Sequence, residues 1–147
     1  MARRALLLPI CGCVLALAAC GGSSGLTKAQ YDAKVSKLCL LAADQLRELH
    51  MDNSVAAWRH SGASVVRISE HFDTSLGTLK APGDIAADAA DFLEANEKLA
   101  SDYKAAVAAA NAGDRGKLLA AGNQSNKDGA ATFAPAKAIG ATGCYIG

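Results

Sequence analysis

The feature that most constrains this chain is a set of apolar and small residues that recur at alternating three- and four-residue steps. Its members are Val55, Trp58, Gly62, Val65, Ser69, Phe72, Leu76 and Leu79. This spacing places all of them on one face of an α-helix and is typical of a seam against a neighbouring helix. Gly62 and Ser69 are its small members, so we expect another helix to approach closely there. The pattern predicts a long helix from about Ser54 to Lys80.

Two further apolar stripes predict helices on either side of this one in the sequence. The first helix is expected from Thr27, which forms a capping box with Gln30, to about His50. Its stripe comprises Tyr31, Val35, Leu38, Ala42, Leu46 and Leu49. The other helix is expected from about Asp84 to Asn111, after a break at Pro82. Its stripe comprises Ile85, Ala89, Phe92, Asn96, Leu99, Tyr103, Val107 and Ala110.

A fourth helical segment begins at Asp114 but has a weaker pattern. Residues 123–129 are poor helix formers, and Pro135 disfavours helical continuity. We therefore expect this helix to be kinked or broken between Asp128 and Pro135, with a non-helical tail after it. Four helices joined by short loops predict an all-α fold, a four-helix up-down-up-down antiparallel bundle over residues 27–147.

The N-terminus has the pattern of an export signal. Arg3 and Arg4 precede an apolar run over residues 5–19. A run of about 15 residues has the length of a signal-peptide core and is too short to span a bilayer. Small residues stand before Cys20, as a signal peptidase requires.

The stretch Leu17-Ala18-Ala19-Cys20 resembles the lipobox of bacterial lipoproteins. The resemblance implies that residues 1–19 are a lipoprotein signal peptide, that Cys20 carries lipid, and that the protein is held at the extracytoplasmic face of the cell membrane. Residues 20–26 are rich in Gly and Ser and would form a flexible tether. An ordinary secretory signal followed by an unrelated cysteine is the alternative.

Two of the five cysteines, Cys39 and Cys144, lie in the predicted domain. An exported chain meets an oxidising compartment, so these two thiols predict one disulfide. Helix geometry opposes this pairing, because Cys39 would lie about 18 Å along the first helix from its start. A straight fourth helix would carry the tail past that point. We therefore expect the fourth helix to stop early.

The predicted second helix carries a polar face away from its seam. His60, Arg67 and His71 lie on this face with Ser64 and form a candidate surface-binding strip for an anionic partner or a metal, or else a solvated surface. His60 and His71 would be about 16 Å apart along a helix, so they cannot share one metal ion. His50, at the end of the first helix, suits the helix dipole and is expected to be structural.

Other polar residues have structural explanations. Asp84, Asp88 and Asp91 share a face at the start of a helix, where acidic side chains suit the dipole, and no calcium-binding loop accompanies them. Ser69 and Asn96 interrupt two apolar stripes. We expect an interhelical hydrogen bond there, with the lining of a small cavity as the alternative.

No catalytic, phosphate-binding, zinc or haem motif is present, so we predict no enzyme activity, no cofactor and no metal. Loss of Arg3 and Arg4 from 15 basic residues leaves 13 against 14 acidic ones, a formal charge of −1. This balance argues against nucleic acid as a partner.

The predicted mature chain is similar to small secreted helical lipoproteins of high-GC bacteria. The similarity rests on Tyr31 and Cys39, a break from Leu79 to Pro82, and the ending from Gly140 to Cys144. We therefore expect a lipid-anchored helical bundle that acts as an envelope interaction or accessory protein, with an unidentified envelope protein as its partner. The alternative is a small-ligand-binding module with a cleft between the second and third helices.

Overall fold

The structure is a computed structural model that describes residues 25–145. The signal peptide, Cys20 and most of the tether lie outside the described residues. The helices are α1 (Lys28–Glu48), α2 (Val55–Gly77), α3 (Ala86–Ala112), α4 (Arg115–Ala131) and α5 (Phe133–Ile139), with 3₁₀ turns η1 (Gly83–Ile85) and η2 (Thr142–Cys144).

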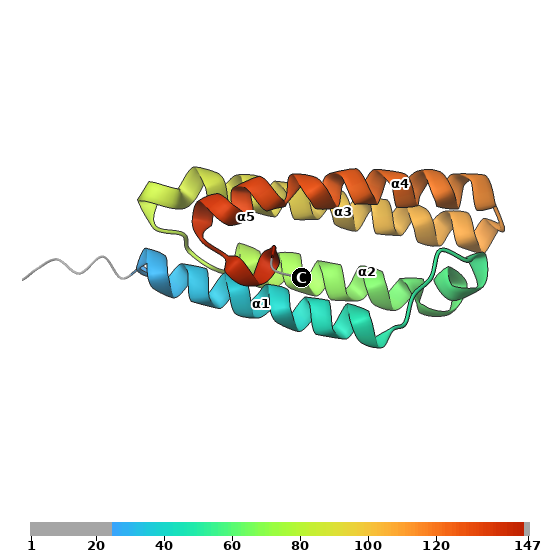
Figure 1. The fold of residues 1–147 in the computed structure, drawn as a ribbon, viewed down its shortest axis with the longest axis horizontal. Helices are drawn as coiled ribbons and strands as arrows, with labels where there is room; N and C mark the ends of the chain where they lie inside the picture. The colour runs from blue at the N-terminus through green and yellow to red at the C-terminus, as the bar shows by residue number, and fades with distance from the viewer. Residues whose placement is uncertain (1–24, 146–147) are drawn as a thin grey trace, which may run out of the picture.

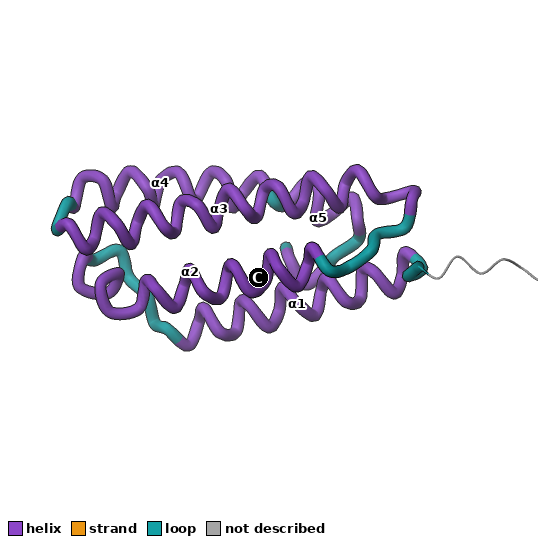
Figure 2. Tube along the Cα trace, turned by 180° about the vertical axis from the view of Figure 1, so that it is seen from behind, coloured by secondary structure: helices purple, strands orange, loops and turns teal. Residues whose placement is uncertain are grey.

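These helices form the predicted all-α antiparallel bundle. Helices α4 and α5 are two parts of the fourth helix, which is bent by 24° at residue 132, inside the range predicted from the sequence. Figures 1 and 2 show two layers, α1 beside α2 and α3 beside α4 and α5. The two layers are joined mainly by packing of α2 against α3.

Local sequence sets the helix ends. Thr27 and Gln30 form the predicted capping box, in which each side chain bonds the other residue's backbone N–H. The side chains of Ser54 and Asp114 cap α2 and α4. Gly113 ends α3 with φ of 73°, a left-handed conformation that favours glycine. The third helix begins with the turn η1, so α3 itself starts slightly later than the sequence suggested.

The buried residues form two separate clusters. One, which we call the tail core, lies at the end of the bundle where the C-terminal tail returns. It comprises Tyr31, Val35, Phe72, Leu76, Ile85, Ala89, Phe92, Ala136, Ile139 and Ala141. The other, which we call the far core, comprises Trp58, Val65, Ala106, Ala109, Ala110 and Leu118. In both clusters the predicted seam of α2 faces inward.

Close approach of α2 and α3 depends on a small residue. A Cβ atom added at Gly62 would lie 2.7 Å from Cγ2 of Val107 on α3. The prediction that Gly62 lets a neighbouring helix approach is therefore confirmed. Phe72 of α2 and Phe92 of α3 meet edge to face in the tail core, with ring centroids 6.2 Å apart.

Burial along α1 declines from its start to its end. Tyr31 and Val35 are fully buried, whereas Leu38, Ala42 and Leu46 of the same stripe are only partly buried. Helix α1 packs against α2 and η2, and α4 packs against α3. The far half of α1 therefore covers the bundle incompletely. Within residues 25–145, no helix is long and apolar enough to cross a membrane.

Candidate functional site

The C-terminal tail reverses direction after α5 and packs against α1. Gly140 ends α5 with φ of 87°, and the chain then runs back along α1 (Figure 1). The Lys28 ammonium donates to the carbonyl of Ile139 at 2.6 Å. A Cβ atom at Gly143 would lie 2.5 Å from the carbonyl oxygen of Ser36, so the tail approaches α1 as closely as a glycine allows.

This reversal explains how the predicted disulfide forms. Cys39 and Cys144 are bonded, with their Cα atoms 5.0 Å apart. The prediction of a disulfide is confirmed, but the expectation that the fourth helix stops early is wrong. The helix continues to Ile139, and the turn at Gly140 brings Cys144 back to the middle of α1. Residues 142–144 also form a 3₁₀ turn, where the sequence suggested a non-helical tail.

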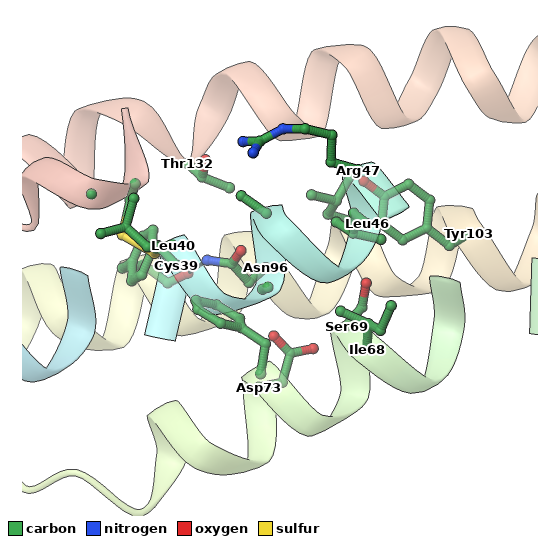
Figure 3. A pocket seen from close by; sticks show the side chains of 17 residues that line it. Cys39, Leu40, Leu46, Arg47, Ile68, Ser69, Asp73, Asn96, Tyr103 and Thr132 are labelled. Carbon is green, nitrogen blue, oxygen red and sulfur yellow. Dashed lines mark hydrogen bonds between the residues drawn. A yellow bond between two sulfur atoms is a disulfide. The ribbon is translucent and has the colours of Figure 1, made fainter. Parts of the chain in front are cut away.

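A cavity of about 250 Å³ lies between the tail core and the far core. Helices α2 and α3 form its floor, α1 and the disulfide form one wall, and the bend between α4 and α5 contributes Thr132 (Figure 3). An engineered cavity of about 150 Å³ binds benzene, so this space is large enough for a ligand of about two fused rings.

Ser69 and Asn96, the residues that interrupt the two apolar stripes, both line the cavity. The Asn96 amide nitrogen donates to the carbonyl of Phe92, one turn earlier in the same helix, at 2.7 Å. The interhelical hydrogen bond expected for Asn96 is therefore replaced by a bond within α3. The alternative expectation, that these two residues line a cavity, is confirmed. Neither side chain is as large as the phenylalanine rings one turn away, and the cavity lies beside both of them.

Asp73 is the charged group on the cavity floor. Figure 3 shows its carboxylate and the Ser69 hydroxyl pointing from α2 toward the space under α1. Its Oδ1 atom is buried and has no hydrogen-bond partner among the described residues. Burial raises the pKa of Asp73 to about 6, with the charge of Glu97 adding, that of Lys104 opposing, and that of Glu70 adding a smaller part.

The remaining lining residues form apolar walls, and the rim carries both apolar and charged side chains. Tyr103 of α3 closes the far side, and burial, followed by the charge of Asp102, raises the pKa of its phenol. Leu40, 52% exposed, stands at the rim. Arg47 also lines the cavity, and its guanidinium pairs with Asp44 at 2.9 Å. The arrangement can hold a small apolar molecule and offer it polar contacts at the floor.

The candidate strip on α2 lies away from this cavity. His60, Arg67 and His71 are exposed, and Arg67 donates to the Ser64 hydroxyl at 3.0 Å. The structure does not bring the two histidines together. His50 is exposed and has φ of 47°, with its Nδ1 2.8 Å from the carbonyl oxygen of Glu48.

The acidic stripe at the start of the third helix lies at the surface. Asp84 and Asp91 are exposed, and Asp88 is partly buried. In the part of the chain from residue 25 to residue 145, no group of three or more His, Cys, Asp or Glu side chains is placed to hold a metal ion.

Asp73 and Arg47 are cavity residues that the sequence did not single out. Asp73 follows Phe72 and lies outside the apolar stripe of α2, so its position reads as a surface position. It is half buried and lines the cavity together with residues of α1 and the tail. The one signal in the sequence was the pair of interruptions at Ser69 and Asn96.

Comparisons of this chain with protein-family models, with curated proteins and with solved structures found no match.

Proposed function

We propose that this protein is a small-ligand-binding domain that is held at the extracytoplasmic face of the cell membrane through lipid on Cys20. The observation that carries the proposal is the cavity of about 250 Å³ over the α2–α3 seam. Ligand sites are concave and mostly apolar, with a few convergent polar groups. The lining of Phe72, Phe92 and Leu99 around Ser69 and Asn96 has this character.

The position of the cavity also supports binding. Its floor belongs to the two helices that join the layers, so the polar groups on the floor are fixed by packing. Its outer wall is the far half of α1, which is only partly buried. The disulfide at Cys39 anchors that wall at one end. A packed floor under a wall that is open to solvent on its outer side suits a site that small molecules can enter.

Binding of a neutral apolar probe tests the proposal. The exported protein, purified with its disulfide intact, is titrated with 2-naphthylmethanol, and the probe's fluorescence is followed. A ligand of about a dozen heavy atoms at roughly 0.5 kcal/mol per atom gives a dissociation constant of about 10–100 µM. We expect saturable binding at one site.

A matched pair of variants locates the binding. Ser69→Leu fills the cavity, whereas Ser101→Leu places the same side chain on an exposed position of α3. We expect Ser69→Leu to weaken binding at least about tenfold and Ser101→Leu to leave it unchanged. Equal binding by Ser69→Leu and wild type, or no saturable binding by wild type, would overturn the proposal.

Anchoring at Cys20 is tested separately by mass spectrometry of the mature N-terminus. We expect a diacylglyceryl group on Cys20, and we expect Cys20→Ala to leave precursor or shed protein. A mature N-terminus at another residue, without lipid, contradicts the anchoring.

A second candidate function is interaction with another envelope protein through the surface. It is favoured by Leu40 and Leu41, which are consecutive on α1 and 52% and 48% exposed, and by the exposed strip of His60, Arg67 and His71. A photo-cross-linking residue at Leu41 should then capture one envelope protein that the same residue at Ala29, exposed at the other end of α1, does not. Identical patterns from both positions would contradict it.

A further inference from the structure

The described lining of the cavity holds one carboxylate, Asp73, that no cation of the lining pairs with, because Arg47 pairs with Asp44. Asp73 lies on the floor, and Glu70 and Glu97 are the other acidic groups that act on it. The ammonium of Lys104 is the nearby cation, and it pairs with Glu70 at 2.9 Å. Among residues 25–145, neither Asp73 nor Glu97 forms an ion pair. Asp73 is therefore a carboxylate of the cavity floor that has no ion-pair partner in this part of the chain.

Asp73 also lacks a hydrogen-bond donor. Its Oδ1 atom is shielded from solvent and has no partner among the described residues. A buried carboxylate oxygen is normally bonded, because an unbonded one loses its hydration without replacement. Arg47 is the cation in the cavity lining, and its guanidinium is engaged by Asp44. The group that would satisfy Asp73 does not come from the described part of the chain.

Two further acceptors share the floor with Asp73. The Asn96 amide nitrogen is used within α3, which leaves its oxygen as the free end. The Ser69 hydroxyl points the same way as the Asp73 carboxylate (Figure 3). An ammonium group presents three N–H donors and no acceptor, so it can donate to the Asp73 carboxylate, and the lining offers hydroxyl and amide oxygens as further acceptors.

We propose that the cavity takes a ligand made of an apolar body and one protonated amine, with Asp73 as its counter-charge. The inference rests on the proposed function that the cavity binds a small molecule. The apolar body lies against Phe72, Leu99 and Tyr103, and the ammonium lies at Asp73. Burial, followed by the charge of Glu97, raises the pKa of Asp73 to about 6, and a bound ammonium group would stabilise its ionised form.

Two probes of the same shape test the charge. The exported protein is titrated at pH 7.5 with 2-naphthylmethylamine, which is protonated, and with 2-naphthylmethanol, which is neutral. A charge-assisted hydrogen bond in a partly buried site should favour the amine about tenfold. Because the contact is shielded, the preference should persist in about 0.5 M NaCl, whereas attraction to surface carboxylates is screened.

A pair of Asp→Asn variants assigns the preference to one residue. Asp73→Asn should bring the affinity ratio of amine to alcohol to about one. Asp102→Asn is the matched control, because Asp102 also has a buried oxygen without a partner and a raised pKa, caused by burial and Asp128, but does not line the cavity. This control should keep the full preference.

The same preference should depend on pH. Between pH 7.5 and pH 5 it should fall toward one as Asp73 becomes protonated. The other charged groups that face Asp73 are Glu70 on α2, Glu97 and Lys104 on α3, and Arg47 on α1. Substitution of Glu97 by Gln should lower the pH at which the preference is lost, since the charge of Glu97 raises the pKa of Asp73.

Each outcome separates the two proposals. Equal binding of both probes by wild type, or an unchanged preference in Asp73→Asn, overturns the amine assignment and leaves the ligand-binding function standing. Failure of both probes to bind overturns both proposals. A preference that Asp102→Asn also loses would show that the effect comes from overall charge, and would overturn the role of Asp73.

Discussion

The tail core and the middle of the bundle are built by the same helices but filled differently. In the tail core, Phe72 and Phe92 pack edge to face, and Leu76 is 2% exposed. About one helical turn further, Ser69 and Asn96 occupy the corresponding seam positions, and a cavity of about 250 Å³ opens there, lined on one side by the same two rings. The difference lies in the side chains, because the backbones of α2 and α3 continue unbroken through both regions.

The comparison indicates that the middle of the bundle is the less stabilising of the two regions. The tail core is closed by a reversed tail, a disulfide and buried aromatic rings, whereas the middle retains a charged residue, Asp73, without a bonding partner for its buried oxygen. Residues that lower stability while forming a cavity are common at binding sites. We therefore expect the tail core to contribute more to the free energy of unfolding than the middle of the bundle does.

A matched pair of leucine truncations tests this comparison with the largest expected effect. Leu76→Ala removes a fully buried side chain from the tail core and should lower the free energy of unfolding by about 3–4 kcal/mol. Leu99→Ala removes a partly buried side chain that already borders the cavity and should cost about 1–2 kcal/mol. Denaturant unfolding measures both. Equal losses would show that the middle is packed as tightly as the tail core.

Removal of the disulfide should have the next largest effect. The bond joins residues separated by 105 positions, so its loss frees a long loop in the unfolded chain. Cys39→Ser with Cys144→Ser should lower stability by about 2–4 kcal/mol. Hydrogen exchange should also become faster at residues 140–145, which depend on this bond to stay against α1. Unchanged exchange in the tail would show that the hydrogen bond from Lys28 and the other tail contacts hold the tail against α1 without the disulfide.

Asp73→Asn should raise stability at high pH. The folded-state pKa of Asp73, about 6, lies above its ordinary value of 3.8, so the folded state binds the proton more tightly than the unfolded state does. Stability from this group is therefore greatest below pH 4 and is lost as the pH rises to 6.

Because Asp73 is only half buried, we discount the full shift and expect the Asn variant to be about 1 kcal/mol more stable than wild type at pH 8. The two proteins should differ little at pH 4. Thermal unfolding at both pH values measures the difference. A variant less stable than wild type at pH 8 would contradict the claim that the carboxylate lacks a partner.

The exposed strip on α2 should give the smallest effects. His60→Ala, Arg67→Ala and His71→Ala should each change stability by less than about 0.5 kcal/mol, as surface substitutions do. None should change probe binding, since none of the three residues lines the cavity. A loss of probe affinity in any of them would show that the site extends around α2.

Short-range patterns predicted most of the fold. The stripe from Val55 to Leu79 indicated which face of α2 is buried, and Gly62 marked the close approach of α3. The disulfide followed from the cysteine count, but the route of the tail did not. The reversal at Gly140 depends on contacts with Lys28 and Ser36, which lie more than 100 residues away in the sequence.

The candidate site was only partly visible in the sequence. Ser69 and Asn96 stood out because they break apolar stripes, and both line the cavity. Asp73 did not stand out, because it lies beside the stripe and its burial depends on where α1 is placed. Helix α1 packs against both α2 and η2, and its contacts with η2, including the disulfide, join residues too far apart for any local pattern to encode.

The most direct test of the central claim, that the space between the two cores is a binding site, is chemical-shift mapping of the ¹⁵N-labelled, disulfide-bonded protein with 2-naphthylmethylamine. We expect the largest amide shifts at Ser69, Asp73 and Asn96, and little change at Trp58 and Leu118 in the far core. Shifts that spread over exposed faces, or that concentrate on the strip of α2, would contradict the account.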